Sequence, residues 1–145
     1  MTHTVSRTIL LTTPSRTVWE ALTDRRAMPS WRRDLLRIER VADIAGHEAW
    51  LESTRFGRVV FETVECQAPN RLVLRIHHPR KAFEGTWTFV LDPAPGGARL
   101  TITESATIHH PLMRILGRFF DPRRTMTQYM MDLARHLGSQ ARFLD

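Results

Sequence analysis

Apolar and polar residues alternate over residues 4–12 at the start of the chain, and this period of two predicts a half-buried β-strand. Thr13 and Pro14 then fit the N-cap and first position of a helix, because proline has no N–H to leave unpaired there. We expect a short helix that ends near residue 23, with its apolar face formed by Val18, Trp19 and Leu22. A second short turn, capped by Asp24, is expected before Pro29.

Residues 34–109 repeat the strand pattern several times. Turn-forming residues such as Gly57 and the pair Pro69–Asn70 separate the apolar stretches. Connections this short require antiparallel neighbours, because a parallel crossover takes a dozen residues or more. The expected strands span residues 34–42, 48–56, 58–67, 71–78, 84–92 and 98–109.

The period becomes helical after Pro111. A first apolar stripe falls within residues 112–120, and Asp121–Pro122 has the composition of a new helix start. A second stripe follows at helical spacing, formed by Met126, Met130, Leu133 and Leu137. With Gly138 as its C-terminal stop, a helix over residues 122–138 would be about 25 Å long at 1.5 Å per residue.

These elements predict an α+β fold. A curved antiparallel sheet of six or seven strands is expected to wrap around the long C-terminal helix, with two short helices after the first strand. We expect a single domain over residues 1–145, since domains commonly have this size. The space between a curved sheet and a helix is a place where apolar pockets form.

Composition narrows the class of protein further. With Cys66 as its single cysteine, the chain has no internal disulfide, and we expect this residue to be a small buried one rather than a nucleophile. The longest apolar runs are only a few residues, too short to span a membrane. The N-terminus has no apolar segment of the signal-peptide kind, so we expect a cytoplasmic protein.

The formal charge of +6 comes almost entirely from arginine, since Lys81 is the only lysine among 21 cations. Ten arginines fall in two groups, residues 25–40 and 114–124. Such groups can attract an anionic lipid head group or membrane surface if they surround the mouth of a cavity. Otherwise they form an ordinary solvated surface.

Two stretches resemble a known superfamily. The first is Ile9-x-Leu11-x-x-Pro14-x-x-x-Val18-Trp19-x-x-Leu22-x-Asp24, followed by Trp31. The second is Gly85-Thr86-Trp87-Thr88-Phe89-x-Leu91-x-Pro93, followed by Gly97-x-x-Leu100-Thr101-Ile102-Thr103-Glu104. With the long C-terminal helix, they resemble the START-related, Bet v 1-like (SRPBCC) superfamily, and most closely its bacterial polyketide cyclase/dehydrase and lipid-transport branch. The resemblance implies a helix-grip fold around a deep hydrophobic cavity. It leaves the activity open, because one fold hosts many functions.

Glu104 is the candidate catalytic residue. It shares the parity of Leu100 and Ile102, so it is expected on the face of the strand that points towards the helix. A desolvated carboxylate there can act as a general base, and the alternative is a strand-end residue paired with an arginine. By the same parity argument Arg7 and His78 are expected at the cavity or its edge, where an arginine could hold an anionic group.

The remaining ligand-binding candidates are aromatic, methionine or branched apolar residues that can both pack a core and line a pocket. They are Trp50, Leu74, Trp87, Phe89, Ile102, Met113, Leu116, Phe119, Met126 and Met130. The inward faces of strands 48–56 and 58–67 stay open, because both parities carry apolar residues. No metal-ligand, nucleotide-binding or hydrolase motif occurs, so we expect neither metal nor cofactor.

The favoured hypothesis is a protein that binds, and can transport, a lipid, isoprenoid, polyketide or similar hydrophobic or aromatic ligand. An anionic membrane surface is an additional candidate partner, and nucleic acid is not expected. The first alternative is a polyketide cyclase or dehydratase that uses Glu104. The second is an interaction module for RNA, the ribosome or a chaperone.

Overall fold

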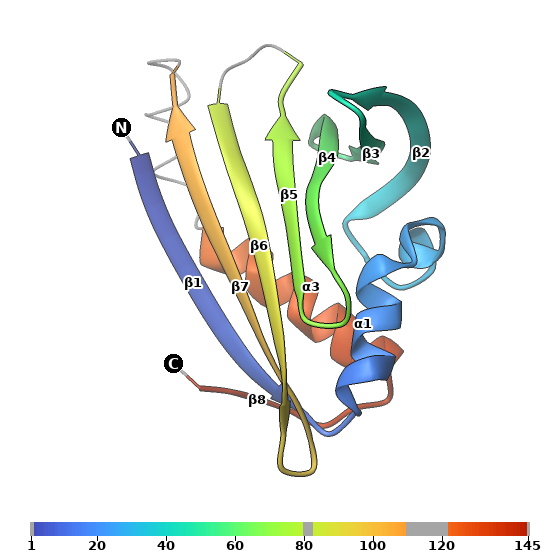
Figure 1. The fold of residues 1–145 in the computed structure, drawn as a ribbon, viewed down its shortest axis with the longest axis vertical. Helices are drawn as coiled ribbons and strands as arrows, with labels where there is room; N and C mark the ends of the chain where they lie inside the picture. The colour runs from blue at the N-terminus through green and yellow to red at the C-terminus, as the bar shows by residue number, and fades with distance from the viewer. Residues whose placement is uncertain (1, 80–82, 110–121, 145) are drawn as a thin grey trace.

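The computed structural model describes residues 2–79, 83–109 and 122–144, apart from the side chain of Phe83. One antiparallel sheet carries helices against one of its faces (Figure 1). We call the face towards α3 the inner face and the opposite one the outer face. The strands are β1 (Thr2–Leu11), β2 (Leu35–Ile44), β3 (His47–Thr54), β4 (Gly57–Gln67), β5 (Arg71–His77), β6 (Phe83–Ala94), β7 (Gly97–Ile108) and β8 (Ala141–Phe143). The helices are α1 (Ser15–Thr23), the 3-10 helix η1 (Arg25–Ser30) and α3 (Pro122–His136).

The predicted α+β fold is confirmed, and the expected six or seven strands are corrected to eight in the sheet that the described residues form. The spatial order is β2-β3-β4-β5-β6-β7-β1-β8, so β1 lies between the two C-terminal strands. The sequence analysis missed β8, which has three residues and pairs with the end of β1, with Ile9 opposite Phe143. Three residues are too few to show a period of two, which explains the miss. The helix expected within residues 112–120 lies outside the described residues.

The helix beginnings differ slightly from expectation. Pro14, rather than Thr13, occupies the N-cap position of α1, with φ −56° and ψ 145°. Its extended ψ makes Ser15 the first helical residue, and no side chain caps the helix. Asp24 precedes η1 without a side-chain capping bond. Cys66 is exposed rather than buried, since it stands next to the last residue of β4.

The core lies between the inner face and the helices. Met126, Met130 and Leu133 of α3 are fully buried, which confirms that the predicted helical stripe faces the sheet. They pack in one cluster with inner-face residues of the sheet, among them Ile9, Leu11, Phe89, Leu91, Leu100 and Ile102. Within the described ranges, no helix is long and apolar enough to cross a membrane.

Candidate functional site

A partly enclosed cavity of about 140 Å³ lies between α3, the η1 segment and strands β3–β6. An apolar cavity of about 150 Å³ accommodates a benzene molecule, so the cavity has room for one aromatic ring. Its apolar wall consists of Leu22, Met28, Val59, Phe61, Leu72, Leu74, Trp87 and Phe89. Its polar lining consists of Arg25, Arg32, Asp34, Glu52, Thr54, Thr125 and Tyr129.

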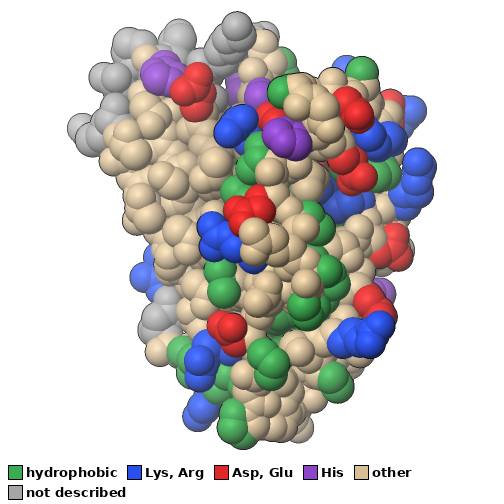
Figure 2. Space-filling view, viewed as in Figure 1, with side chains coloured by type: hydrophobic (Ala, Val, Ile, Leu, Met, Phe, Trp, Pro, Cys, Tyr) green, Lys and Arg blue, Asp and Glu red, His purple; other side chains and the backbone are tan. Residues whose placement is uncertain are grey.

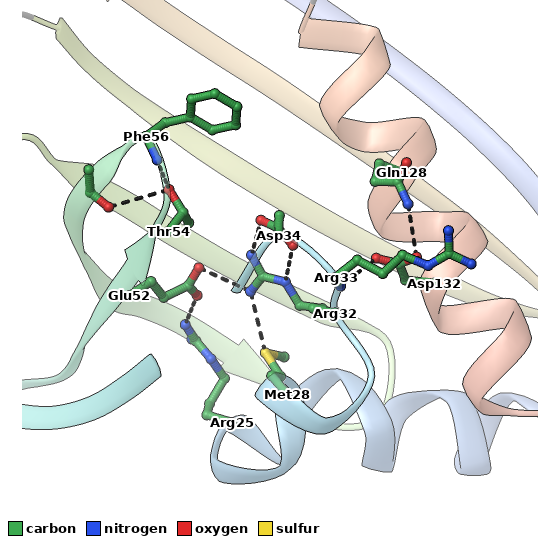
Figure 3. Close-up of polar contacts among 11 residues, drawn as sticks. Arg25, Met28, Arg32, Arg33, Asp34, Glu52, Thr54, Phe56, Gln128 and Asp132 are labelled. Atoms are coloured by element: carbon green, nitrogen blue, oxygen red, sulfur yellow. Dashed lines mark hydrogen bonds and ion pairs between the residues drawn. The ribbon is translucent and has the colours of Figure 1, made fainter. Parts of the chain in front are cut away.

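A chain of four charged side chains, three of them buried, forms one part of this lining (Figure 3). Arg25 Nη2 donates to Glu52 Oε2 at 2.8 Å, and Arg32 Nη1 lies 3.0 Å from Glu52 Oε1. Arg32 Nη2 donates to Asp34 Oδ2 at 3.0 Å. Both arginines and Glu52 are less than a tenth exposed. Burial alone would lower the pKa of Arg32, but the neighbouring carboxylates of Glu52 and Asp34 outweigh it and raise that pKa. The two positive and two negative charges therefore neutralise one another inside the wall.

Tyr129 of α3 faces the same cluster from the helix side. Its ring lies 5.7 Å from that of Phe89 and 6.0 Å from that of Trp87, and the Arg32 guanidinium lies 5.2 Å from its centroid. Burial raises the pKa of Tyr129 to about 12, so the hydroxyl keeps its proton at neutral pH. Among the described residues, none forms a hydrogen bond with this hydroxyl. Tyr129 thus offers an unused donor at the cavity.

The segment that carries Arg32 and Asp34 is fastened to α3 by Asp132. This carboxylate is fully buried and accepts hydrogen bonds from the backbone N–H of Arg33 at 2.9 Å and from Gln128 Nε2 at 2.9 Å. Arg135 Nη2 donates to it at 2.7 Å. Figure 3 shows Asp132 and Gln128 on α3 meeting Arg33 from the opposite segment. This contact fixes the distance between the helix wall and the charged wall of the cavity.

Of the ligand-binding candidates, Leu74, Trp87 and Phe89 line the cavity. Ile102, Met126 and Met130 are instead fully buried in the packed core and are not among its lining residues. Trp50 lies outside the lining too, with the Arg26 guanidinium 5.1 Å from its ring. Three further candidates lie outside the described residues, namely Met113, Leu116 and Phe119.

Glu104 lies on the inner face, as its parity predicts. Its two oxygens are engaged separately, because Trp87 Nε1 donates to Oε1 at 2.8 Å and His3 Nε2 lies 3.2 Å from Oε2. Glu104 is not one of the described residues that line the cavity, but it holds the indole of one that does. The Arg7 guanidinium bonds the hydroxyl of Thr127 and lies 3.8 Å above the Phe143 ring, also outside the lining. His78 follows the last residue of β5 and is not in the lining either.

Several lining residues were missed by the sequence analysis. Glu52, Thr54, Val59 and Phe61 belong to the two strands whose inward faces were left open, and register places them on the inner face with Leu74. Tyr129 carried a usable signal, because it stands three residues after Met126 on the buried stripe of α3. The residue type of Arg25 and Arg32 was misleading, because arginine is almost never fully buried unless it is paired. Both were therefore expected in a surface group rather than in a cavity wall.

The first arginine group is therefore not a simple basic rim. Two of its members, Arg25 and Arg32, belong to the cavity wall. Three of its exposed members are paired with acids, and the exposed Arg26 lies over the Trp50 ring instead. Arg37 Nε lies 2.7 Å from Glu39 Oε1, and ion pairs also join Arg33 to Asp132 and Arg40 to Asp43. In Figure 2, blue and red side chains stand next to one another on the visible face. In the second group, Arg123 and Arg124 are exposed on α3, while Arg114 and Arg118 lie outside the described residues.

A third buried acid, besides Glu52 and Asp132, lies on the outer face. Glu62 of β4 is only 1% exposed and is held by His47 Nδ1 at 2.6 Å, His77 Nε2 at 2.9 Å and Arg75 Nη1 at 3.4 Å. Burial would raise the pKa of Glu62, but the hydrogen bonds from the two histidines and the charge of Arg75 lower it overall. In the part of the chain that the structure describes, no three His, Cys, Asp or Glu side chains are arranged to hold a metal ion.

Comparison with known proteins identifies the family. Residues 2–140 match the family described as polyketide cyclase / dehydrase and lipid transport, whereas no curated protein sequence matches the chain. The di-domain ARO/CYC StfQ from the steffimycin biosynthetic pathway shares the fold at 16% identity and a TM-score of 0.73. The alignment covers 93% of this chain and 49% of StfQ, so this chain spans about half the length of that protein.

Two further solved structures share the fold. A START superfamily protein from Mycobacterium smegmatis is 17% identical, with a TM-score of 0.71 over 94% of this chain and 97% of that one. The Zhui aromatase/cyclase from Streptomyces sp. R1128 is 11% identical, with a TM-score of 0.63 over 76% of this chain and 70% of that one. Identities this low show the fold alone. The family match itself covers nearly the whole sequence, and the chain therefore belongs to the polyketide cyclase / dehydrase and lipid transport family.

Proposed function

We propose that this protein binds, and carries, a small hydrophobic or aromatic ligand in the cavity between the sheet and α3. The observation that supports the proposal is the cavity itself, whose wall combines eight apolar side chains with a localised polar cluster. Ligand pockets commonly have this character, since apolar walls supply burial and a few polar groups fix orientation. The room for one ring favours a single ring system or one end of a longer molecule.

The test compares a substitution that fills the cavity with a matched substitution on the other face of the same strand. Val59 lines the cavity, while its neighbour Val60 points to the outer face of the same strand. We expect Val59→Trp to abolish binding of a fluorescent apolar dye in the cavity, and Val60→Trp to leave dye binding intact. Native mass spectrometry of the purified protein would identify a retained ligand. Equal dye binding by both variants would contradict the proposal.

A cyclase or dehydratase is the second candidate, and the position of Glu104 favours it. This carboxylate holds the indole of Trp87, which lines the cavity, so a proton acceptor stands one side chain away from a bound ligand. The test is chromatographic assay of cyclisation of a reactive polyketide chain. A rate lowered at least a hundredfold by Glu104→Gln supports a base, which typically contributes 10²–10⁴-fold. Normal turnover by this variant rules it out.

We further propose an anionic membrane surface as the place where the ligand is exchanged. The turn between β3 and β4 carries Phe56, 81% exposed, between the exposed residues Arg55 and Arg58. Thr54 and Val59, on either side of this turn, line the cavity. Figure 3 shows Phe56 pointing away from the buried charged cluster. An exposed aromatic ring with adjacent cations favours contact with anionic lipid, each cation near the surface contributing about 1 kcal/mol.

A further inference from the structure

The charged side chains of the cavity lining are paired with one another, two positive with two negative. Each oxygen of Glu52 lies within 3.0 Å of a different arginine, and Arg32 also engages Asp34. Arg25, Arg32 and Glu52 are buried, so their mutual attraction is only weakly screened by solvent. Neither arginine is left without a counter-charge. An anionic or cationic ligand would therefore add an uncompensated charge to a desolvated wall, which is costly unless a partner is present.

The cavity nevertheless offers donors for an uncharged group. The Tyr129 hydroxyl has no hydrogen-bond partner among the described residues, and burial raises its pKa to about 12, still further above neutral pH than that of an ordinary tyrosine. Beside it, Nε of Arg25 is fully buried without an acceptor in the described structure. A buried donor without an acceptor is unfavourable, and supplying an acceptor recovers that loss. The wall thus favours a hydrogen-bond acceptor that carries no charge.

We propose that the cavity selects an uncharged ligand with a ring-sized apolar body and a hydrogen-bond acceptor such as a carbonyl oxygen, and discriminates against carboxylates and organic cations of the same size. The ring packs against Trp87, Phe89 and Tyr129, and the acceptor oxygen accepts a hydrogen bond from the Tyr129 hydroxyl beside the Arg25–Glu52–Arg32–Asp34 chain. This inference rests on the proposed function, because it assigns the chemistry of the ligand in the same cavity.

Four probes of nearly equal size test the inference at pH 7, namely acetophenone, cumene, benzoate and benzamidinium. Each is titrated into the isotope-labelled protein, and dissociation constants are measured from NMR shifts of cavity residues. We expect acetophenone to bind at least tenfold more tightly than benzoate or benzamidinium, and several-fold more tightly than cumene. This comparison needs no variant. Benzoate binding as tightly as acetophenone overturns the charge inference alone, whereas failure of all four probes to bind overturns the proposed function as well.

Variants then assign the effect to named groups. Tyr129→Phe removes the hydroxyl and keeps the ring, and we expect the preference for acetophenone over cumene to disappear. Asp34→Asn leaves the wall with one extra positive charge, and we expect affinity for benzoate relative to acetophenone to rise at least fivefold. Glu39→Gln is the matched control, since it changes the net charge equally but pairs with Arg37 outside the cavity. The same rise in Glu39→Gln, or none in Asp34→Asn, contradicts the role of the wall charges.

Discussion

Removing the charge of Glu52 should destabilise the protein much more than removing that of an exposed glutamate. Glu52 lies between Arg25 and Arg32, with contacts of 2.8 and 3.0 Å. The three side chains are 5%, 5% and 9% exposed. Glu52→Gln keeps the shape of the side chain and leaves two guanidinium groups in a desolvated wall with only Asp34 to compensate them. The perturbation is therefore electrostatic rather than steric.

The size of the effect follows from burial. Breaking a buried ion pair by removing one partner costs about 3–5 kcal/mol, a large share of the roughly 5–15 kcal/mol that stabilises a domain. At about 2–4 °C per kcal/mol for a chain of this size, Glu52→Gln should lower the Tm by about 6–20 °C. The control is Glu39→Gln, whose partner Arg37 is 71% exposed, and exposed pairs contribute only about 0–1 kcal/mol.

Thermal unfolding by circular dichroism, with urea titration to obtain the free energy of unfolding, measures both variants against the parent protein. If the Tm of Glu52→Gln stays within about 3 °C of that of Glu39→Gln, the buried charges do not hold the wall together. The reasoning about the cavity would then fail at its first step.

The other predictions concern three separate regions. Because the pKa of Glu62 is lowered in the folded protein, its stabilising contribution is complete above the unfolded pKa of about 4.3 and is lost as pH falls through the folded pKa. Urea titrations should therefore show a larger loss of unfolding free energy between pH 5 and 3 in the parent protein than in Glu62→Gln. Equal losses in the two proteins would contradict this reasoning. Phe56→Ser should reduce co-sedimentation with phosphatidylserine vesicles severalfold and leave dye binding unchanged, and undiminished sedimentation would remove the membrane proposal. Gly97→Ala should cost about 1–3 kcal/mol in urea unfolding, because a Cβ there would lie 1.9 Å from the Leu11 carbonyl oxygen; a neutral change would mean that the strands shift freely.

The fold could be predicted largely because its strands alternate and its last helix is strongly amphipathic. Parity placed Glu104 on the inner face correctly, since a strand's side chains alternate whatever its neighbours are. The same rule failed for the strand that carries Glu52, where both parities hold apolar residues and only the pairing with neighbouring strands decides the face.

The charged wall was beyond such reasoning for a different reason. Arg25 and Glu52 are far apart in the sequence and meet only because the fold brings η1 and β3 within side-chain reach of each other. The periodicity of a segment predicts which face of that helix or strand is buried. It does not predict which two elements bring opposite charges together. The arginines of residues 25–40 therefore looked like one surface group, although the fold divides them between a cavity wall and exposed ion pairs.

The position of β1 in the sheet has a consequence for how the chain folds. Strand β1 precedes the other strands of the sheet in the sequence and pairs with one of the last, with Thr2 opposite Thr107 and Leu11 opposite Ala98, and α3 follows later still. Strands β2–β6 pair with their neighbours in the sequence, whereas β1 pairs with β7, which lies far along the chain. Such non-local contacts form slowly during folding. The helix α3 packs against β1, so the cavity wall that it contributes also depends on contacts between distant parts of the chain. A ligand that needs the finished cavity can stabilise only chains that have already folded, so it acts on the persistence of the native state rather than on the path that leads there.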